Sequence, residues 1–336
     1  MSNVWIPEHY DPMLSPMETQ RAIKKIKDYF QQELAYGLNL RRVSAPLFVS
    51  PETGLNDNLT GTERRVEFTV KDMDEHRVEI VQSLAKWKRM ALGKYGIEPG
   101  HGIYTDMNAI RRDEDLDNLH SIYVDQWDWE KVIDKEDRTE SYLRETVRTI
   151  YNAVKNLGDY VNRLYRDLRT EIPNEIYFIT SQELEDRYPD KSPKEREELI
   201  TREYGSVFIE KIGGNLRSGK PHDGRSPDYD DWELNGDILL RNEILDRAFE
   251  ISSMGIRVDQ EAMDRQLRLA AADDRRDLPF QQAVLREKLP YTIGGGIGQS
   301  RLCMFFLRKA HIGEVQASIW PDAIVASCRE NGIFLL

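Results

Sequence analysis

The chain has 336 residues, of which 32% are charged and 40% hydrophobic, as in a globular protein with a large core. Its 59 acidic residues outnumber its 47 basic residues, giving a net charge of −12, so neither nucleic acid nor a membrane surface is expected as a partner. Cys303 and Cys328 form no CxxC pair, which argues against a disulfide scaffold or a cysteine-built zinc site. Because no signal-peptide pattern and no apolar stretch of ~18 residues occurs, we expect a cytoplasmic protein.

The N-terminal part begins with a predicted helix followed by short strands. Apolar residues recur every three or four positions over 17–38, which predicts an amphipathic helix. Residues 41–48 are expected to form a strand, and Pro46 within it favours an edge or interface position over the centre of a sheet. Dense turn residues predict a loop over 51–61. The next predicted elements are strands over 65–70 and 77–83 and a helix over 83–96.

Residues 121–130 alternate with period two, as in a half-buried strand. Gln126 and Asp128 would share one face of this strand, and Trp127 and Trp129 would lie on the other. Gln126 and Asp128 either mark the solvent-exposed end of the strand or belong to a binding site. Burying the Asp128 carboxylate without a cationic or amine partner would be costly, so a face that keeps it predicts such a partner.

The longest predicted helix covers 138–169, where apolar residues alternate steps of four and three and should pack on a sheet or another helix. Because the order of elements lacks regular βαβ alternation, it predicts an α+β fold with a mostly antiparallel sheet flanked by helices. No linker divides the chain, so we expect a single domain over 1–336. The remaining predicted elements are strands over 175–180, 206–212, 237–240 and 248–252 and helices over 259–270, 280–288 and 298–309.

Two glycine-rich segments resemble nucleotide-binding loops but lack essential positions. The stretch GNLRSGKP has Pro221 where a P-loop needs a magnesium-binding hydroxyl. The stretch GGGIGQ has Gln299 where the dinucleotide-binding motif needs its third glycine. The six histidines show no zinc-hydrolase spacing, and no GxSxG elbow occurs.

Charged residues on predicted strands and at a predicted helix start suggest an anion-binding site. Asp237 and Glu250, on neighbouring strands, would suit a magnesium ion, although each alone is typical of a surface carboxylate. The glycines over 294–298 predict a turn before a helix whose first turns carry Arg301, an arrangement that attracts phosphate. Such a site fits a polyanionic nucleotide, its magnesium ion and a small zwitterion. The cations predicted there are Lys88, Arg111, Arg257 and Arg301.

Over nearly its whole length, the chain resembles the bacterial ammonia-dependent asparagine synthetases, the aspartate–ammonia ligases. That family is similar to the catalytic core of aspartyl-tRNA synthetase, so the resemblance implies a class II aminoacyl-tRNA synthetase-like antiparallel sheet flanked by helices. The helix over 17–38 and the strand after it resemble motif one of that class, which implies a homodimer. The stretches that carry the resemblance are QSLAKWKRMALG (82–93), RRDEDLDNLHSIYVDQWDWE (111–130), SQELEDRYPD (181–190), SPDYDDW (226–232), LNGDIL (234–239), FEISSMGIRVD (249–259) and TIGGGIGQSRLCMFFL (292–307).

The resemblance implies a two-step reaction. ATP would activate the β-carboxylate of L-aspartate as β-aspartyl-AMP with release of pyrophosphate, and ammonia would then displace AMP to give L-asparagine. Arg111 is implied to contact the α-phosphate and Arg301 the terminal phosphates, while Asp237 and Glu250 would hold Mg²⁺. The residues implied to line the adenosine site are Ser121, Val124 and Ser252.

At the amino-acid end, Lys88 and Arg257 resemble a pair that grips a carboxylate of aspartate. Because the β-carboxylate must face the nucleotide, this pair should hold the α-carboxylate, for which the arginine fork is suited. Asp57 is our hypothesis for the group that captures ammonium or takes its proton. The expected catalytic residues are Asp57, Arg111, Gln126 and Arg301. The other residues expected around aspartate are Ser83, Gln126, Asp128, Asp230 and Ser253.

Three alternatives compete with this reading. A tRNA-charging paralogue would need a domain to read an anticodon, and the first helix near residue 17 is expected to leave no room for one. A non-catalytic regulator is expected to have lost the residues implied to hold the nucleotide, all of which are present. A glutamine-dependent amidotransferase needs a nucleophile such as an N-terminal cysteine, which the sequence lacks.

Overall fold

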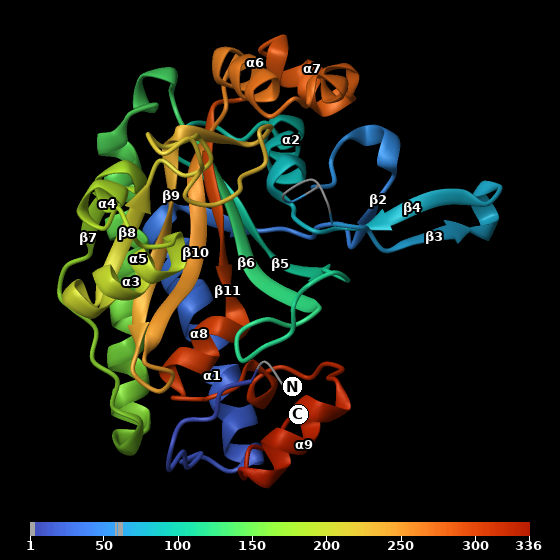
Figure 1. The fold of residues 1–336 in the computed structure, drawn as a ribbon. Coiled ribbons are helices and arrows are strands. Elements are labelled where there is room, and N and C mark those ends of the chain that lie inside the picture. Colours follow the sequence, from blue (N-terminus) through green and yellow to red (C-terminus); the bar gives the residue numbers. More distant parts are fainter. Residues whose placement is uncertain (1–3, 58, 60–62) are drawn as a thin grey trace.

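A computed structural model describes residues 4–57, 59 and 63–336 of the chain (Figure 1). Its strands are β1 (Leu40–Arg42), β2 (Phe48–Val49), β3 (Glu67–Val70), β4 (His76–Ile80), β5 (Gly102–Ile110), β6 (Tyr123–Val132), β7 (Tyr177–Thr180), β8 (Ser206–Glu210), β9 (Asp230–Asn242), β10 (Arg247–Arg257) and β11 (Thr292–Gly298). Its helices are α1 (Pro16–Leu38), α2 (Ala85–Tyr95), α3 (Glu140–Leu164), α4 (Ser181–Arg187), α5 (Pro193–Tyr204), α6 (Gln260–Leu269), α7 (Pro279–Leu285), α8 (Gln299–Phe306) and α9 (Asp322–Glu330).

The described strands form an eight-stranded sheet in the order β1-β5-β6-β11-β10-β9-β8-β7 and a three-stranded sheet in the order β2-β4-β3. The outer pairs β1–β5 and β7–β8 are parallel, and the other neighbours are antiparallel. The predicted α+β fold with a mostly antiparallel sheet is therefore confirmed. No helix within the described residues is both long and apolar enough to span a membrane.

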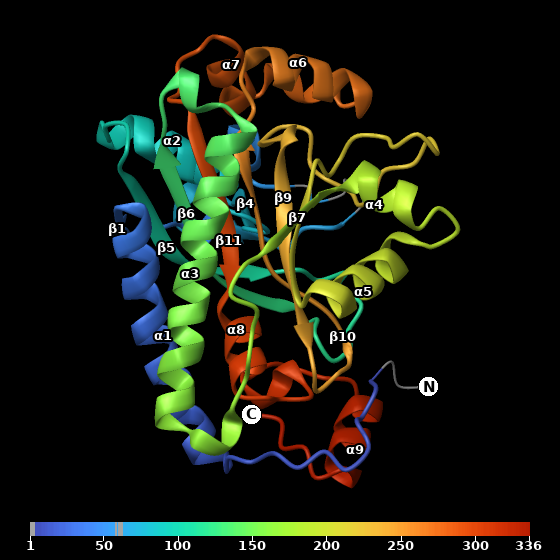
Figure 2. The same cartoon turned by 90° about the vertical axis from the view of Figure 1, so that its left-hand side faces the viewer.

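Helices α1 and α3 lie side by side over one face of the large sheet, whereas α2 lies behind it (Figure 2). The residues at the centre of this packed layer are large and apolar: Phe30 of α1 contacts Trp127 of β6 with a ring-centroid distance of 4.7 Å. Trp127 and Trp129 are fully buried, as their predicted face requires. The alternation of β6 consequently directs Gln126 and Asp128 to the opposite face of the sheet.

The boundaries of α1 follow from its sequence. Ser15 accepts a hydrogen bond from the Glu18 backbone and the Glu18 carboxylate accepts one in return, while Asn39 closes the helix in the left-handed conformation with φ of 59°. The predicted helix over 17–38 is thus confirmed. The helix predicted over 138–169 was too long, because α3 ends at Leu164, which is exposed, and a short 3-10 helix follows.

The single strand predicted over 41–48 is wrong, whereas its predicted edge position is confirmed, because β1 and β2 each lie at the edge of a sheet. The segment forms β1 in the large sheet and β2 in the small one, and Pro46 lies between them because it cannot donate a backbone hydrogen bond to a ladder. The loop predicted over 51–61 contains a 3-10 helix, Pro51–Thr53, and its positions 58, 60 and 61 lie outside the described residues.

The glycine turn predicted over 294–298 is also wrong, because these residues belong to β11 at the centre of the sheet. A Cβ atom at Gly294 would overlap the Glu130 carboxylate, and one at Gly296 would overlap the Gln126 amide. These glycines therefore make room for polar side chains of the neighbouring strand rather than for a turn.

Several elements were not predicted: β5, α4, α5 and α9. Helix α5 has the sequence PKEREELITREY, in which charged residues interrupt the apolar period. Its start is nevertheless marked by a capping box between Ser192 and Glu195 and by Pro193 in the first turn. Local capping was therefore the readable signal for this helix, rather than hydrophobic spacing.

Candidate active site

A cavity of about 480 Å³ is lined by Gln126 and Asp128 and therefore lies on the face of β6 opposite the buried Trp127 and Trp129. Strands β6, β10 and β11 and the segments before β6 and β9 contribute its walls. All predicted site residues line it except Lys88, which is buried, and Asp237. The predicted residues on the wall are Asp57, Ser83, Arg111, Ser121, Val124, Gln126, Asp128, Asp230, Glu250, Ser252, Ser253, Arg257 and Arg301.

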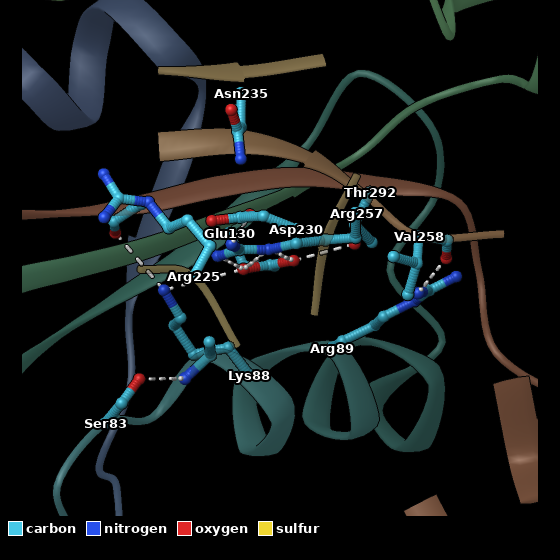
Figure 3. A network of polar contacts seen from close by, with 12 residues as sticks. Ser83, Lys88, Arg89, Glu130, Arg225, Asp230, Asn235, Arg257, Val258 and Thr292 are labelled. Carbon is cyan, nitrogen blue, oxygen red and sulfur yellow. Dashed lines mark hydrogen bonds and ion pairs between the residues drawn. The ribbon is translucent and has the colours of Figure 1, made fainter. Parts of the chain in front are cut away.

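Arg257 is the centre of a buried ionic network at one end of the cavity (Figure 3). Its Nε and Nη2 donate to the Glu130 carboxylate at 2.9 and 2.7 Å, and its Nη1 donates to Asp230. Burial alone would raise the pKa of Glu130, but the charges of Arg257 and Lys88 outweigh it and lower that pKa. These bonds use three of the five guanidinium N–H groups, so two remain for a ligand.

Lys88 lies beneath the cavity wall with a side chain only 1% exposed. Its ammonium group donates to the Asp128 carboxylate, to the Trp129 carbonyl at 2.7 Å and to the Gly295 carbonyl at 3.2 Å. An ammonium group has three donors, and all three are engaged here. The geometry therefore favours a role for Lys88 in fixing Asp128 over the predicted direct contact with a substrate carboxylate.

Asp128 presents a second carboxylate oxygen, Oδ2, that is buried and has no hydrogen-bond partner among the described residues. Burial is the main cause that raises the pKa of Asp128, and the Lys88 charge opposes it. A buried carboxylate with one unsatisfied oxygen on a cavity wall is a binding group for an amine or another donor.

Asp57 is held by its neighbour Asn56, whose side-chain oxygen accepts hydrogen bonds from the backbone of Asp57 and Gln82 at 3.0 and 2.9 Å. The Asn56 carbonyl accepts from Lys86, which is also paired with Asp228 at 2.9 Å. Within the described part of the chain, the Asp57 Oδ2 atom is buried without a partner. The loop is thus anchored at its backbone, and of the two Asp57 carboxylate oxygens Oδ1 accepts from the Leu59 backbone at 3.1 Å while Oδ2 stays available.

At the other end of the cavity, two arginines are less completely paired. The Arg111 side chain is 28% exposed, and its contact with Glu114 is 4.0 Å long. Arg301 donates to the Glu250 carbonyl at 2.8 Å. The hydroxyl of Ser252, a residue of β10 on the cavity wall, is buried without a partner in the described structure. Such groups suit an anionic ligand with several acceptors.

Asp237 and Glu250 lie on the adjacent strands β9 and β10, as predicted, but Asp237 is already occupied. The Arg225 guanidinium donates to both Asp237 carboxylate oxygens. The side chain of Arg225 is 13% exposed and that of Asp237 is 8% exposed. Burial, together with the charge of Glu250, raises the pKa of Asp237 to about 6, although Arg225 opposes the shift. Two carboxylates supply only part of the shell of a metal ion, and no group of three or more potential protein ligands occurs within the described residues.

Some of the buried side-chain polar atoms that have no partner among the described residues lie on the wall of this cavity. Five of them belong to charged or hydroxyl side chains on its wall, and a buried polar atom left without a partner costs about 1–3 kcal/mol. Such a cluster is expected of a site whose partners come from a ligand. The atoms are Asp57 Oδ2, Arg111 Nε, Asp128 Oδ2, Arg225 Nε and Ser252 Oγ.

Comparison with known proteins identifies the family. The model of the family described as aspartate-ammonia ligase matches residues 17–332. An aspartate–ammonia ligase of Clostridium perfringens is 60% identical over the full length of both chains, and one of Levilactobacillus brevis is 59% identical over 98% of this chain and 99% of its own. The chain belongs to the aspartate–ammonia ligase family. The predicted resemblance and the prediction of a ligase are therefore confirmed.

The fold also matches class II aminoacyl-tRNA synthetases. An asparaginyl-tRNA synthetase of Entamoeba histolytica, solved with asparaginyl-adenylate, has a TM-score of 0.61 at 13% identity, covering 90% of this ligase and 66% of the synthetase. One from Pyrococcus horikoshii has a TM-score of 0.58 at 15% identity, covering 90% and 70% of the two chains. At this identity the likeness concerns the fold alone, and it confirms the predicted class II synthetase-like architecture of the ligase.

Sequence reasoning missed three residues of this site. Glu130 and Tyr229 lie close to Arg257, one as its ion-pair partner and one with its ring 5.7 Å from the guanidinium. Arg225 precedes the stretch SPDYDDW and was not distinguished from a surface cation. The available signal was its place as a lone arginine beside an acidic segment.

Proposed function

We propose that this ligase makes L-asparagine from L-aspartate, ammonia and ATP through β-aspartyl-AMP, releasing pyrophosphate and AMP. One observation carries the proposal: a single cavity joins an end rich in arginines to an end where Arg257, Glu130, Asp230 and Asp128 form a buried network. The first end suits phosphates, and the second suits a zwitterion that offers both a carboxylate and an ammonium group.

Aspartate would bind with its α-carboxylate on the free N–H groups of Arg257 and its ammonium group on Asp128 Oδ2. Asp230 and Ser83 line the same end, and Ser253 and Gln126 line the wall toward the nucleotide. In this orientation the β-carboxylate points to the α-phosphate. The site would thus select the distal carboxylate by fixing the groups at the proximal carbon.

In the first step, a β-carboxylate oxygen forms a bond to the α-phosphorus and the bond to pyrophosphate breaks. Arg111 would neutralise charge that develops on the α-phosphate, and Arg301 would stabilise the leaving pyrophosphate. Ser121, Val124 and Ser252 would line the adenosine site. Gln126 would orient the reacting carboxylate, since its amide lies beside Gly296 on the wall between the two ends.

Mg²⁺ would neutralise phosphate charge in this step, held by Asp237 and Glu250. Oxygen ligands of this kind suit Mg²⁺, which commonly takes one or two carboxylates and completes its shell with substrate phosphates and water. The two carboxylates fit this pattern once Arg225 releases Asp237.

In the second step, ammonia attacks the acyl carbon and the bond from that carbon to AMP breaks. Only the neutral amine is a nucleophile, so ammonium must lose a proton before the attack and the adduct must lose another after it. The Asp57 carboxylate, with its unpartnered Oδ2 atom on the cavity wall, is our candidate for binding the cation and accepting a proton.

We also propose that the enzyme is a homodimer with one catalytic domain over residues 1–336. The small sheet of β2, β3 and β4 projects from the body of the molecule (Figure 1). Phe48 belongs to β2 and Phe68 to β3. Their rings meet edge to face at 5.4 Å and are 46% and 41% exposed. An exposed aromatic pair on an extended arm favours self-association, which light scattering on the eluting protein would test. A cytoplasmic location without a nucleic-acid partner stays a prediction from the sequence.

The reaction is tested by analysing products from aspartate, ATP and ammonium. We expect AMP, pyrophosphate and asparagine, and we expect exchange of labelled pyrophosphate into ATP without ammonium. Formation of ADP, or of asparagine only with glutamine, would contradict the proposal.

Asp57→Asn should slow asparagine formation while keeping pyrophosphate exchange. Asp72→Asn, which changes an exposed carboxylate, is the control and should alter neither rate. Equal loss of both rates in Asp57→Asn would refute a role confined to the ammonia step.

A further inference from the structure

Among the described arginines that line the cavity, Arg225 is the one that the proposed reaction leaves without a task, and its side chain is 13% exposed. It occupies the Asp237 carboxylate through both oxygens, and Glu250 on the next strand is electrostatically coupled to the same guanidinium. A guanidinium therefore lies where the sequence predicts a magnesium ion. Two cations that need the same carboxylate oxygens exclude one another, because like charges repel strongly in a buried position.

The Arg225 guanidinium lies on the cavity wall, where a bound nucleotide would offer it other partners than Asp237. Arg225 belongs to the segment 223–226, which lines the cavity together with Arg111 and Arg301 and adopts neither helix nor strand. Its Nε atom is buried without a partner among the residues described. Phosphate oxygens entering the cavity would supply acceptors in the bidentate geometry that a guanidinium prefers.

We propose that Arg225 is a placeholder cation, which holds Asp237 in the absence of nucleotide and exchanges it for phosphates when nucleotide and divalent cation arrive together. The inference rests on the proposed nucleotide site. It explains how two buried carboxylates stay stable before the metal ion binds, since a buried carboxylate without a cation is costly. Because Arg225 competes for Asp237, the free enzyme should also bind the metal ion only weakly.

The test measures Mn²⁺ binding to the full-length protein without nucleotide, from the electron paramagnetic resonance signal of the free ion. The variant Arg225→Gln should bind Mn²⁺ at least tenfold more tightly than the wild type. The double variant Arg225→Gln/Asp237→Asn should lose this gain. Equal affinity in the wild type and Arg225→Gln would overturn the proposal, and so would a gain that persists in the double variant.

Thermal stability gives a second readout, because Arg225→Gln leaves a buried carboxylate without its cation. Mg²⁺ alone should raise the melting temperature of Arg225→Gln and leave that of the wild type unchanged, since only a ligand of the folded state stabilises it. Arg268→Gln, which removes a guanidinium from the surface residue Asp264, is the matched control and should behave as the wild type does. No response of Arg225→Gln to Mg²⁺ would also contradict the exchange.

These measurements contain neither aspartate nor nucleotide. Failure of the AMP-forming reaction would therefore leave their outcome unchanged. Conversely, if the wild type bound Mn²⁺ as tightly as Arg225→Gln does, the placeholder role of Arg225 would be refuted. That result would not contradict the proposed AMP-forming reaction.

Discussion

The two ends of the cavity differ in how completely their charged groups are paired. At the proposed amino-acid end, Lys88 uses all its donors and Arg257 uses three of five, in side chains 1% and 3% exposed. At the proposed nucleotide end, the Nε atoms of Arg111 and Arg225 have no partner within the described residues. The cations of the proposed amino-acid end are therefore held in place without a ligand, whereas we expect ligands to complete the pairing of the cations at the proposed nucleotide end.

The largest effect should follow from breaking the organised end. Arg257→Met leaves Glu130 and Asp230 buried without their shared cation, so we expect a loss of about 3–5 kcal/mol in the free energy of unfolding. Urea unfolding at pH 7 measures it. A loss below about 1 kcal/mol would show that the network is not prebuilt in the free enzyme.

Substitution of an arginine at the proposed nucleotide end should lower activity but change the free energy of unfolding little. Arg111→Ala removes a half-buried donor aimed at developing charge, so pyrophosphate exchange should fall by about 10²–10³-fold. Stability should change little, because its contact with Glu114 is long and partly exposed. Arg112→Ala, an exposed neighbour, is the control. A loss of stability comparable to that of Arg257→Met would erase the contrast between the two ends.

The anchor of the Asp57 loop should show its own pH dependence. Burial disfavours the charged form of Asp228 and by itself would raise the pKa of this carboxyl group. The charges of Lys86 and Arg275 outweigh burial and lower the pKa of Asp228 from 3.8 to about 2. Because the folded-state pKa is the lower one, this charge stabilises the fold by about 2 kcal/mol above pH 5, and the contribution declines as the pH falls toward 2.

The stability difference between the wild type and Asp228→Asn should therefore shrink by about 1 kcal/mol from pH 5 to pH 3. Urea unfolding across this range measures it. A difference that is constant or grows toward low pH would mean that the Asp228 charge is not what holds the loop.

The smallest effect on activity is expected on the wall between the two ends. In Gly296→Ala the new methyl group would displace the Gln126 amide, and the KM for aspartate should rise about tenfold, as expected for the loss of one net hydrogen bond. Gly214→Ala is the matched control, because a Cβ there meets no atom within 4 Å. An unchanged KM in Gly296→Ala would exclude Gln126 from substrate orientation.

The sequence could predict the organised end better than the nucleotide end. Alternation along β6 separated Trp127 and Trp129 from Gln126 and Asp128, because burial on one face forces the polar residues to the other. The same alternation could not reveal that Lys88 points at Asp128 from a helix 40 residues earlier in the chain. That contact depends on tertiary packing.

Glycine and arginine were the residues most easily misread. The glycines of β11 have the composition of a turn, yet their role depends on the side chains of the strand beside them. Arg225 follows no period and no motif, so its pairing with Asp237 was visible only once the fold brought the two together. The roles of the site residues stay predictions until variants are measured.

The orientation of aspartate is tested most directly by trapping the activated acid with hydroxylamine, in the presence of ATP and Mg²⁺ and without ammonium. The hydroxamate should carry its label on the distal carbon, as β-aspartyl hydroxamate, and AMP should accumulate in equal amount. A hydroxamate at the α-carboxyl group would mean that Arg257 holds the other end of the molecule, and would contradict the account.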